Sequence, residues 1–119
     1  MDTVPYEGIF SVLKTMKRGV FVEKTKPRES TIEKRLIAEV KKAGGITFKL
    51  VSPGTAGIPD RVVILPGGRV YFVEVKAPGK LPRPLQIRQM TRIQDIGGVC
   101  AVVDGYDSIH QVLSGWLLR

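Results

Sequence analysis

The stretch from Arg61 to Lys76, RVVILPGGRVYFVEVK, decides how the middle of this chain folds. Two runs rich in β-branched and aromatic residues flank Pro66-Gly67-Gly68, a pattern typical of two strands joined by a tight turn. A turn centred on the two glycines places Asp60, at the open end of the hairpin, almost opposite Glu74 and Val75. The sequence therefore predicts a β-hairpin that brings two carboxylates together.

The segments on both sides of this hairpin alternate between helical and strand-like patterns. Helices are predicted where apolar residues recur every three to four positions, and strands where short apolar or alternating runs occur. In chain order these are a helix from 30 to the glycines at 44–45, a strand over 46–51, the hairpin strands over 61–65 and 69–76, a helix over 84–96, a strand over 99–103 and a helix over 108–118. The order α-β-β-β-α-β-α predicts an α/β fold with a mixed central β-sheet flanked by helices.

The first 29 residues differ from the rest of the chain. Ile9, Val12, Leu13 and Met16 recur at helical spacing, and a polar stretch over 23–29 has the composition of a connector. We expect residues 1–29 to form an N-terminal helix and connector, and residues 30–119 to form the main domain. The helix has two possible roles, docking on the main domain or making a subunit contact.

Charge and composition narrow the class of protein. The chain has 119 residues, with 19 Lys and Arg against 11 Asp and Glu, and its formal net charge of +8 favours a polyanionic partner, most often nucleic acid. No apolar run approaches the ~20 residues of a membrane-spanning helix, and the N-terminus lacks a signal-peptide pattern. We therefore expect an intracellular, cytoplasmic protein with no membrane partner. Cys100 and His110 are the only residues of their types, which excludes an internal disulfide and a His-rich or all-cysteine metal site.

Asp60, Glu74 and Lys76 form the most informative constellation. Glu74 and Lys76 are two residues apart on a strand, so both project from the same face. Two carboxylates placed opposite each other repel unless a cation lies between them, and oxygen ligands without His or Cys suit Mg²⁺ or Mn²⁺. A simpler alternative is an exposed Glu–Lys ion pair beside a Pro-Asp turn. Against it, Glu74 lies in an otherwise apolar strand, where a carboxylate needs a partner.

These residues carry a family resemblance. Gly57-Ile58-Pro59-Asp60 followed by Glu74-Val75-Lys76, a Pro- and Gly-containing loop and a helix that opens with Gln86 resembles the active-site pattern of the PD-(D/E)XK nuclease superfamily. Within that superfamily it is similar to the VRR-NUC (virus-type replication-repair nuclease) family of stand-alone phage and bacterial type. The resemblance covers roughly residues 30 to 104. It implies a restriction-endonuclease-like core and a DNA endonuclease that depends on Mg²⁺ or Mn²⁺.

The resemblance also implies a role for each residue that matches the motif. Asp60, Glu74 and the Val75 carbonyl are expected to bind the metal, and Lys76 is expected to be the catalytic lysine. Glu33 corresponds to the helix carboxylate and is an additional candidate ligand, and Gln86 corresponds to the helix glutamine of the catalytic set.

The local sequence offers alternatives for the last two residues. Glu33 shares a helical stripe with Leu36 and Val40, but it also has the spacing of a capping box with Ser30. Gln86 leads an inward-facing stripe, and a buried glutamine that bonds a backbone group is the simpler role. Where family members tend to have an aromatic residue shortly after this glutamine, the chain has residues 87–90, Ile-Arg-Gln-Met.

Five basic residues and no acidic residue occupy positions 76–94. Basic side chains near the motif are candidates for binding the DNA backbone, although a solvated basic face is the commoner role: Lys80, Arg83, Arg88, Arg92 and Arg61. By resemblance, a stand-alone member is a homodimer, and two sites related by a two-fold axis suit symmetric cuts at a four-way (Holliday) junction. The alternatives are a nuclease for flaps, ends or single strands, and a non-catalytic DNA-binding module.

Overall fold

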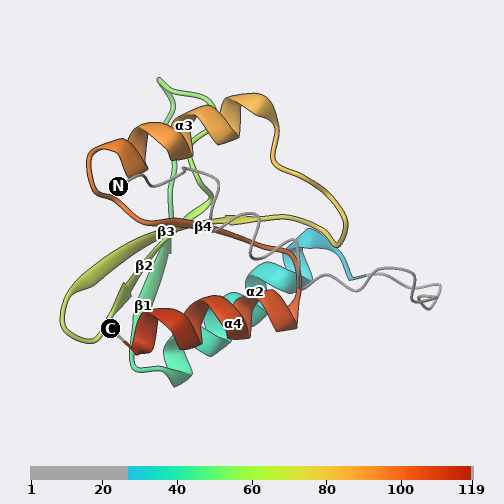
Figure 1. Cartoon of the computed structure of the whole chain (residues 1–119). Helices are drawn as coiled ribbons and strands as arrows, with labels where there is room; N and C mark the ends of the chain where they lie inside the picture. Colours follow the sequence, from blue (N-terminus) through green and yellow to red (C-terminus); the bar gives the residue numbers. More distant parts are fainter. Residues whose placement is uncertain (1–26, 119) are drawn as a thin grey trace.

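A computed structural model of the chain describes residues 27–118. It contains the predicted order of elements, which is shown in Figure 1. These elements are α2 (Glu29–Lys42), β1 (Ile46–Lys49), β2 (Arg61–Leu65), β3 (Arg69–Val75), α3 (Pro84–Asp95), β4 (Cys100–Val103) and α4 (Tyr106–Leu117). The predicted N-terminal helix lies outside the described residues. Among residues 27–118, no helix is both long enough and apolar enough to cross a membrane.

The four strands form one mixed sheet, as predicted, and the structure places them in the order β1-β2-β3-β4. Strand β2 is antiparallel to both of its neighbours, β1 and β3, and β4 is parallel to β3. In the hairpin, Arg61 pairs with Val73, so the preceding Asp60 lies next to Glu74 and Val75. Leu65 pairs with Arg69, so the turn has three residues, Pro66-Gly67-Gly68, and Gly68 N donates to Leu65 O at 3.0 Å. Gly67 and Gly68 both have positive φ, a conformation that glycine adopts without steric cost.

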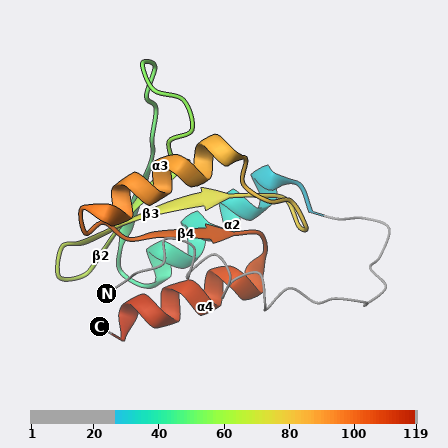
Figure 2. The ribbon, with the colours of Figure 1, turned by 45° about the horizontal axis from the view of Figure 1, so that its top comes forward.

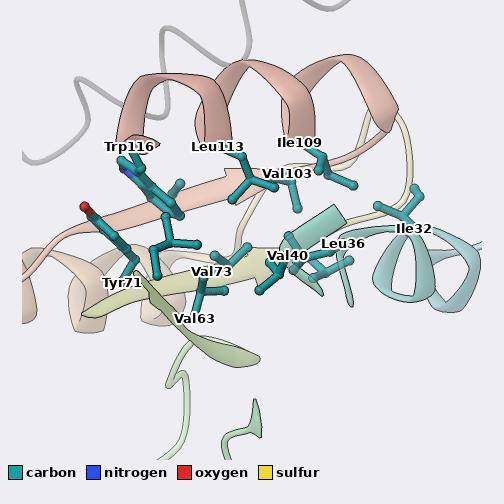
Figure 3. Packing of buried hydrophobic residues seen from close by; sticks show 13 residues of the cluster. Ile32, Leu36, Val40, Val63, Tyr71, Val73, Val103, Ile109, Leu113 and Trp116 are labelled. Carbon is teal, nitrogen blue, oxygen red and sulfur yellow. The ribbon is translucent and has the colours of Figure 1, made fainter. Parts of the chain in front are cut away.

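Helices α2 and α4 cover one face of the sheet, and α3 covers part of the other (Figures 1 and 2). Buried side chains from both helices meet the sheet in the main core, and Figure 3 labels Ile32, Leu36, Val40, Val63, Tyr71, Val73, Val103, Ile109, Leu113 and Trp116. The rings of Tyr71 and Trp116 stack with their centroids 4.0 Å apart. This burial of apolar surface is the main driving force for the fold.

The other face of the sheet is only half covered. There, α3 packs Met90 against Cys100 and Val102, over strands β3 and β4. The part of the same face formed by β1, β2 and the start of β3 has no described helix over it. Its side chains include Ile46, Phe48 and Val70, which are 53%, 55% and 46% exposed.

One local prediction is wrong. Helix α2 begins at Glu29 with Arg28 as its N-cap residue, and no side chain of the described residues 27–118 caps it. The predicted capping box between Ser30 and Glu33 is therefore absent. The physical reason is that the Glu33 carboxylate binds two cations from the sheet, Lys49 and Arg61.

Candidate metal centre and nuclease site

The site lies where the chain enters β2, beside the carboxyl end of β3. The loop that leads to Asp60 is held from two sides. Leu50 N donates to Asp60 O at 2.8 Å, and Gln89 Nε2 of α3 donates to Ala56 O at 3.2 Å. Gly57 has φ +86°, and a Cβ at this position would lie 2.9 Å from the Leu85 side chain and backbone. The close approach of this loop to α3 therefore depends on glycine.

Asp60 is bonded to the backbone of β3. Its Oδ2 atom accepts a hydrogen bond from Val75 N at 2.9 Å. The N–H and C=O of one strand residue project toward the same edge, so the Val75 carbonyl is also directed to the side of Asp60. The predicted juxtaposition of Asp60 with Val75 is present in the structure.

Glu74 is the most unusual residue of the site, because it is a carboxylate that is only 1% exposed. Its Oε2 atom accepts a hydrogen bond from Gln86 Nε2 at 2.6 Å and lies 3.3 Å from Lys76 Nζ. Its Oε1 atom has no hydrogen-bond partner among residues 27–118. Burial and, secondarily, the charge of Asp60 raise the pKa of Glu74 to about 7, against the opposing effect of Lys76. A buried carboxylate oxygen without a partner is energetically costly, and a cation would satisfy it.

These atoms fit a hard divalent cation. Asp60, Glu74 and the Val75 carbonyl supply oxygen atoms only, the ligand chemistry that Mg²⁺ and Mn²⁺ prefer. Within residues 27–118, no group of three or more His, Cys, Asp and Glu side chains gathers around one point. The candidate centre therefore combines two carboxylates with a backbone carbonyl and leaves the remaining positions to water or substrate.

Gln86 bonds both a backbone group and a carboxylate of the site. It projects inward from the first turn of α3 and is 7% exposed. Its Oε1 atom accepts a hydrogen bond from Arg83 N at 2.8 Å, while its Nε2 atom donates to Glu74. The same amide thus satisfies a backbone N–H at the N-terminus of α3 and orients the Glu74 carboxylate.

Glu33 and Arg61 form a separate cluster. Arg61 Nη1 lies 2.7 Å from Glu33 Oε2, and Lys49 Nζ lies 3.3 Å from the same oxygen. Burial raises the pKa of Glu33, but hydrogen bonds and charges from Arg61 and Lys49 outweigh it and leave the pKa below its usual value. The described contacts of Glu33 thus join it to Arg61 and Lys49, and not to Asp60 or Glu74.

The placement of Arg61 does not favour its expected role as a DNA contact. The Arg61 side chain projects toward α2, where it bonds Glu33, whereas the preceding Asp60 bonds the backbone of β3 through its Oδ2 atom. Arg61 is 8% exposed, and its guanidinium is already bonded to Glu33 and Thr47. It therefore has little surface left for a phosphate.

The other predicted basic residues lie on the surface. Lys80, Arg83, Arg88 and Arg92 are exposed, and Arg88 and Arg92 line a shallow groove of about 420 Å³ along α3. Arg92 Nη1 donates to Gln89 Oε1 at 3.1 Å, which restrains its orientation.

The sequence-based search missed Gln89, which links α3 to the loop that carries Asp60. Its position was detectable, because residues three apart on a helix share a face and Gln86 was already predicted to point inward. What the sequence did not reveal was its partner, a loop carbonyl 33 residues away.

The topology and the Asp60, Glu74 and Lys76 arrangement define a restriction-endonuclease-like nuclease domain. A solved structure titled "VRR_NUC domain" matches with a TM-score of 0.68 and 31% identity, over 72% of this chain and 94% of that chain. A protein of Acyrthosiphon pisum secondary endosymbiont phage 1, named "Putative nuclease p44", is 51% identical over 80 residues, 67% of this chain and 86% of the relative. No protein-family model matches the sequence. The chain belongs to the VRR-NUC family of nucleases.

Proposed function

We propose that this chain is a DNA endonuclease that depends on Mg²⁺ or Mn²⁺ and hydrolyses phosphodiester bonds in structured DNA, foremost four-way junctions. The observation that carries this proposal is the buried Glu74 carboxylate beside Asp60, with one oxygen unpartnered and Lys76 Nζ 3.3 Å from the other. A structural ion pair would not need an oxygen left without a partner.

The residues divide the chemistry among them. Asp60, Glu74 and the Val75 carbonyl would hold the ion, which supplies Lewis acidity at the scissile phosphate when bound. Lys76 has a side chain that is 13% exposed and is held against Glu74. Its ammonium is positioned to stabilise the negative charge that builds up on the phosphate oxygens, or to orient the attacking water. Gln86 keeps the Glu74 carboxylate in one orientation.

The exposed basic residues of α3 and its preceding loop support binding of the DNA backbone. Lys80, Arg83, Arg88 and Arg92 lie on the segment that also supplies Gln86, so a phosphate chain held there would pass close to the metal centre. Cationic side chains contact phosphates without reading sequence. DNA shape would thus determine where the enzyme binds.

A homodimer is part of this proposal. The half-open apolar face with Ile46, Phe48 and Val70 supports it, because exposed apolar surface beside an edge strand is typical of a protein interface. A two-fold axis would present two sites to the arms of a junction. Sedimentation of the wild type and of Phe48→Asp tests this, and a wild type that remains monomeric at micromolar concentration would contradict it.

Cleavage of labelled DNA tests the activity. A four-way junction, a flap and a plain duplex are incubated with Mg²⁺, Mn²⁺, Ca²⁺ or EDTA and either the wild type, Asp60→Ala, Lys76→Ala or the control Lys42→Ala. We expect the wild type and the control to cut the junction with Mg²⁺ or Mn²⁺, and both site variants to lose at least ~100-fold in rate. Cutting that survives both site substitutions would refute the proposal.

The same assay distinguishes the alternatives. Preferred cleavage of the flap or of single strands would identify a nuclease for those structures. Binding of the junction without cleavage under any metal would identify a non-catalytic module. The similarity to a phage protein named as a nuclease supports action inside a bacterial or phage-infected cell.

A further inference from the structure

Arg61 is a buried cation directly next to a candidate metal ligand, and the proposed reaction does not use it. Its guanidinium makes three hydrogen bonds, to Glu33 Oε2 at 2.7 Å, to Thr47 Oγ1 at 3.1 Å and to Thr47 O at 3.4 Å. The Thr47 hydroxyl in turn donates to Val62 O at 2.8 Å. These bonds join α2, β1 and β2 at one point.

The position of this cross-link matters for the site. Arg61 is the first residue of β2, and Asp60 immediately precedes it. Asp60 accepts two hydrogen bonds, one at its backbone carbonyl from Leu50 N and one at Oδ2 from Val75 N. Both bonds depend on where β2 begins. The bonds of the Arg61 side chain to Glu33 and Thr47 hold the backbone at the start of β2, and this is the point from which the adjacent Asp60 side chain reaches Val75 N.

A buried arginine is costly unless its donors are satisfied, so this arrangement persists only while Glu33 and Thr47 are both in place. Lys49 contributes less, because its side chain is 62% exposed and is paired with Glu33 at the longer distance of 3.3 Å. The geometry thus identifies one essential cation in the cluster and one dispensable cation.

We propose that Arg61 is a positioning residue for the metal centre, which it supports by fixing Asp60 at the entry to β2. This inference rests on the proposed metal-dependent function. Groups that orient metal ligands from outside the coordination shell typically change metal affinity by 10- to 100-fold when they are removed.

Mn²⁺ binding provides a readout that is independent of cleavage. Isothermal titration calorimetry and the electron paramagnetic resonance signal of free Mn²⁺ give the Kd for the wild type, Arg61→Met, Arg61→Lys, Thr47→Val and the matched control Lys49→Met. We expect Arg61→Met to weaken Mn²⁺ binding at least 10-fold and Arg61→Lys to weaken it less, because lysine keeps the charge but not the three-bond geometry. Lys49→Met should stay within twofold of the wild type.

Thermal melting shows which variants remain folded. If Arg61→Met does not fold, Thr47→Val replaces it in the test, because this variant removes the Thr47 Oγ1 acceptor and leaves the arginine in place. We then expect the Kd for Mn²⁺ to rise threefold or more.

Three results are decisive. Mn²⁺ affinity within twofold of the wild type in Arg61→Met, or in Thr47→Val if the former is unfolded, would overturn the inference and leave the proposed function intact. A wild type that binds no Mn²⁺ would instead refute the proposed function, together with this inference. If Arg61 were a DNA contact, Arg61→Met would remove one phosphate contact. The slope of log K against log salt for junction binding would then fall by about 1, while the Mn²⁺ affinity stayed constant.

Discussion

Replacing Glu74 with Gln should stabilise the metal-free protein at alkaline pH. The pKa of this buried carboxyl is raised from 4.5 to about 7, so the folded state retains a proton that the unfolded chain has already released. The free energy of unfolding therefore falls as pH rises from about 4.5 to about 7. A pKa shift of this size corresponds to a loss of ~3 kcal/mol in the unfolding free energy of the wild type. The Glu74→Gln variant should not show this loss, because glutamine does not titrate.

Urea denaturation in EDTA between pH 5 and 8.5 measures this effect. The difference in unfolding free energy between Glu74→Gln and the wild type cancels the other titrating groups. Between pH 5 and 8.5 it should grow in favour of the variant by ~2.5 kcal/mol, because the unfolded chain has already released most of the proton at pH 5. Adding Mn²⁺ at pH 8 should stabilise the wild type by mass action and leave Glu74→Gln almost unchanged. If the difference in unfolding free energy is the same at pH 5 and at pH 8.5, Glu74 is not a buried carboxylate with a raised pKa, and the reasoning is refuted.

Three further predictions concern two surface arginines, a leucine of the core and the buried cysteine. Arg88→Ala with Arg92→Ala should weaken junction binding and lower the slope of log K against log salt by about 2, as two lost phosphate contacts would; an unchanged slope would make them ordinary surface residues. Leu36→Ala should lower the free energy of unfolding by about 2–5 kcal/mol in urea, because Leu36 is 1% exposed, whereas the exposed neighbour Ile37→Ala should cost far less. Burial raises the pKa of the Cys100 thiol to about 12, so the native protein should resist a thiol-disulfide reagent at pH 8 and react only after unfolding in guanidinium. Rapid reaction of the folded protein would contradict this burial.

Much of the fold was predictable because its signals are local. The two glycines of the hairpin turn determine the register, and the alternation of strand side chains then places Asp60 beside Glu74. Helical periodicity put Gln86 on the inner face of α3, and the structure confirms that position. The mixed sheet followed from the order of the elements.

The site residues that the sequence described poorly are those whose partners are distant in the chain. Glu33 matched a capping box with Ser30, but its carboxylate bonds Arg61, which lies 28 residues away. Gln89 looked like any other polar helix residue, yet it holds a loop 33 residues earlier. Short-range patterns do not report such contacts, because the geometry that creates them exists only after helices pack on the sheet.

The sequence by itself therefore determined the hairpin, the order of elements and the set of oxygen and ammonium groups that meet at its open end. Only the tertiary structure decided which of these groups is buried, which oxygen of Glu74 is left without a partner, and that Arg61 faces α2 instead of solvent. The physical reason is that burial and hydrogen-bond satisfaction depend on every element packed around a group. Turn geometry and strand alternation depend only on a few neighbouring residues.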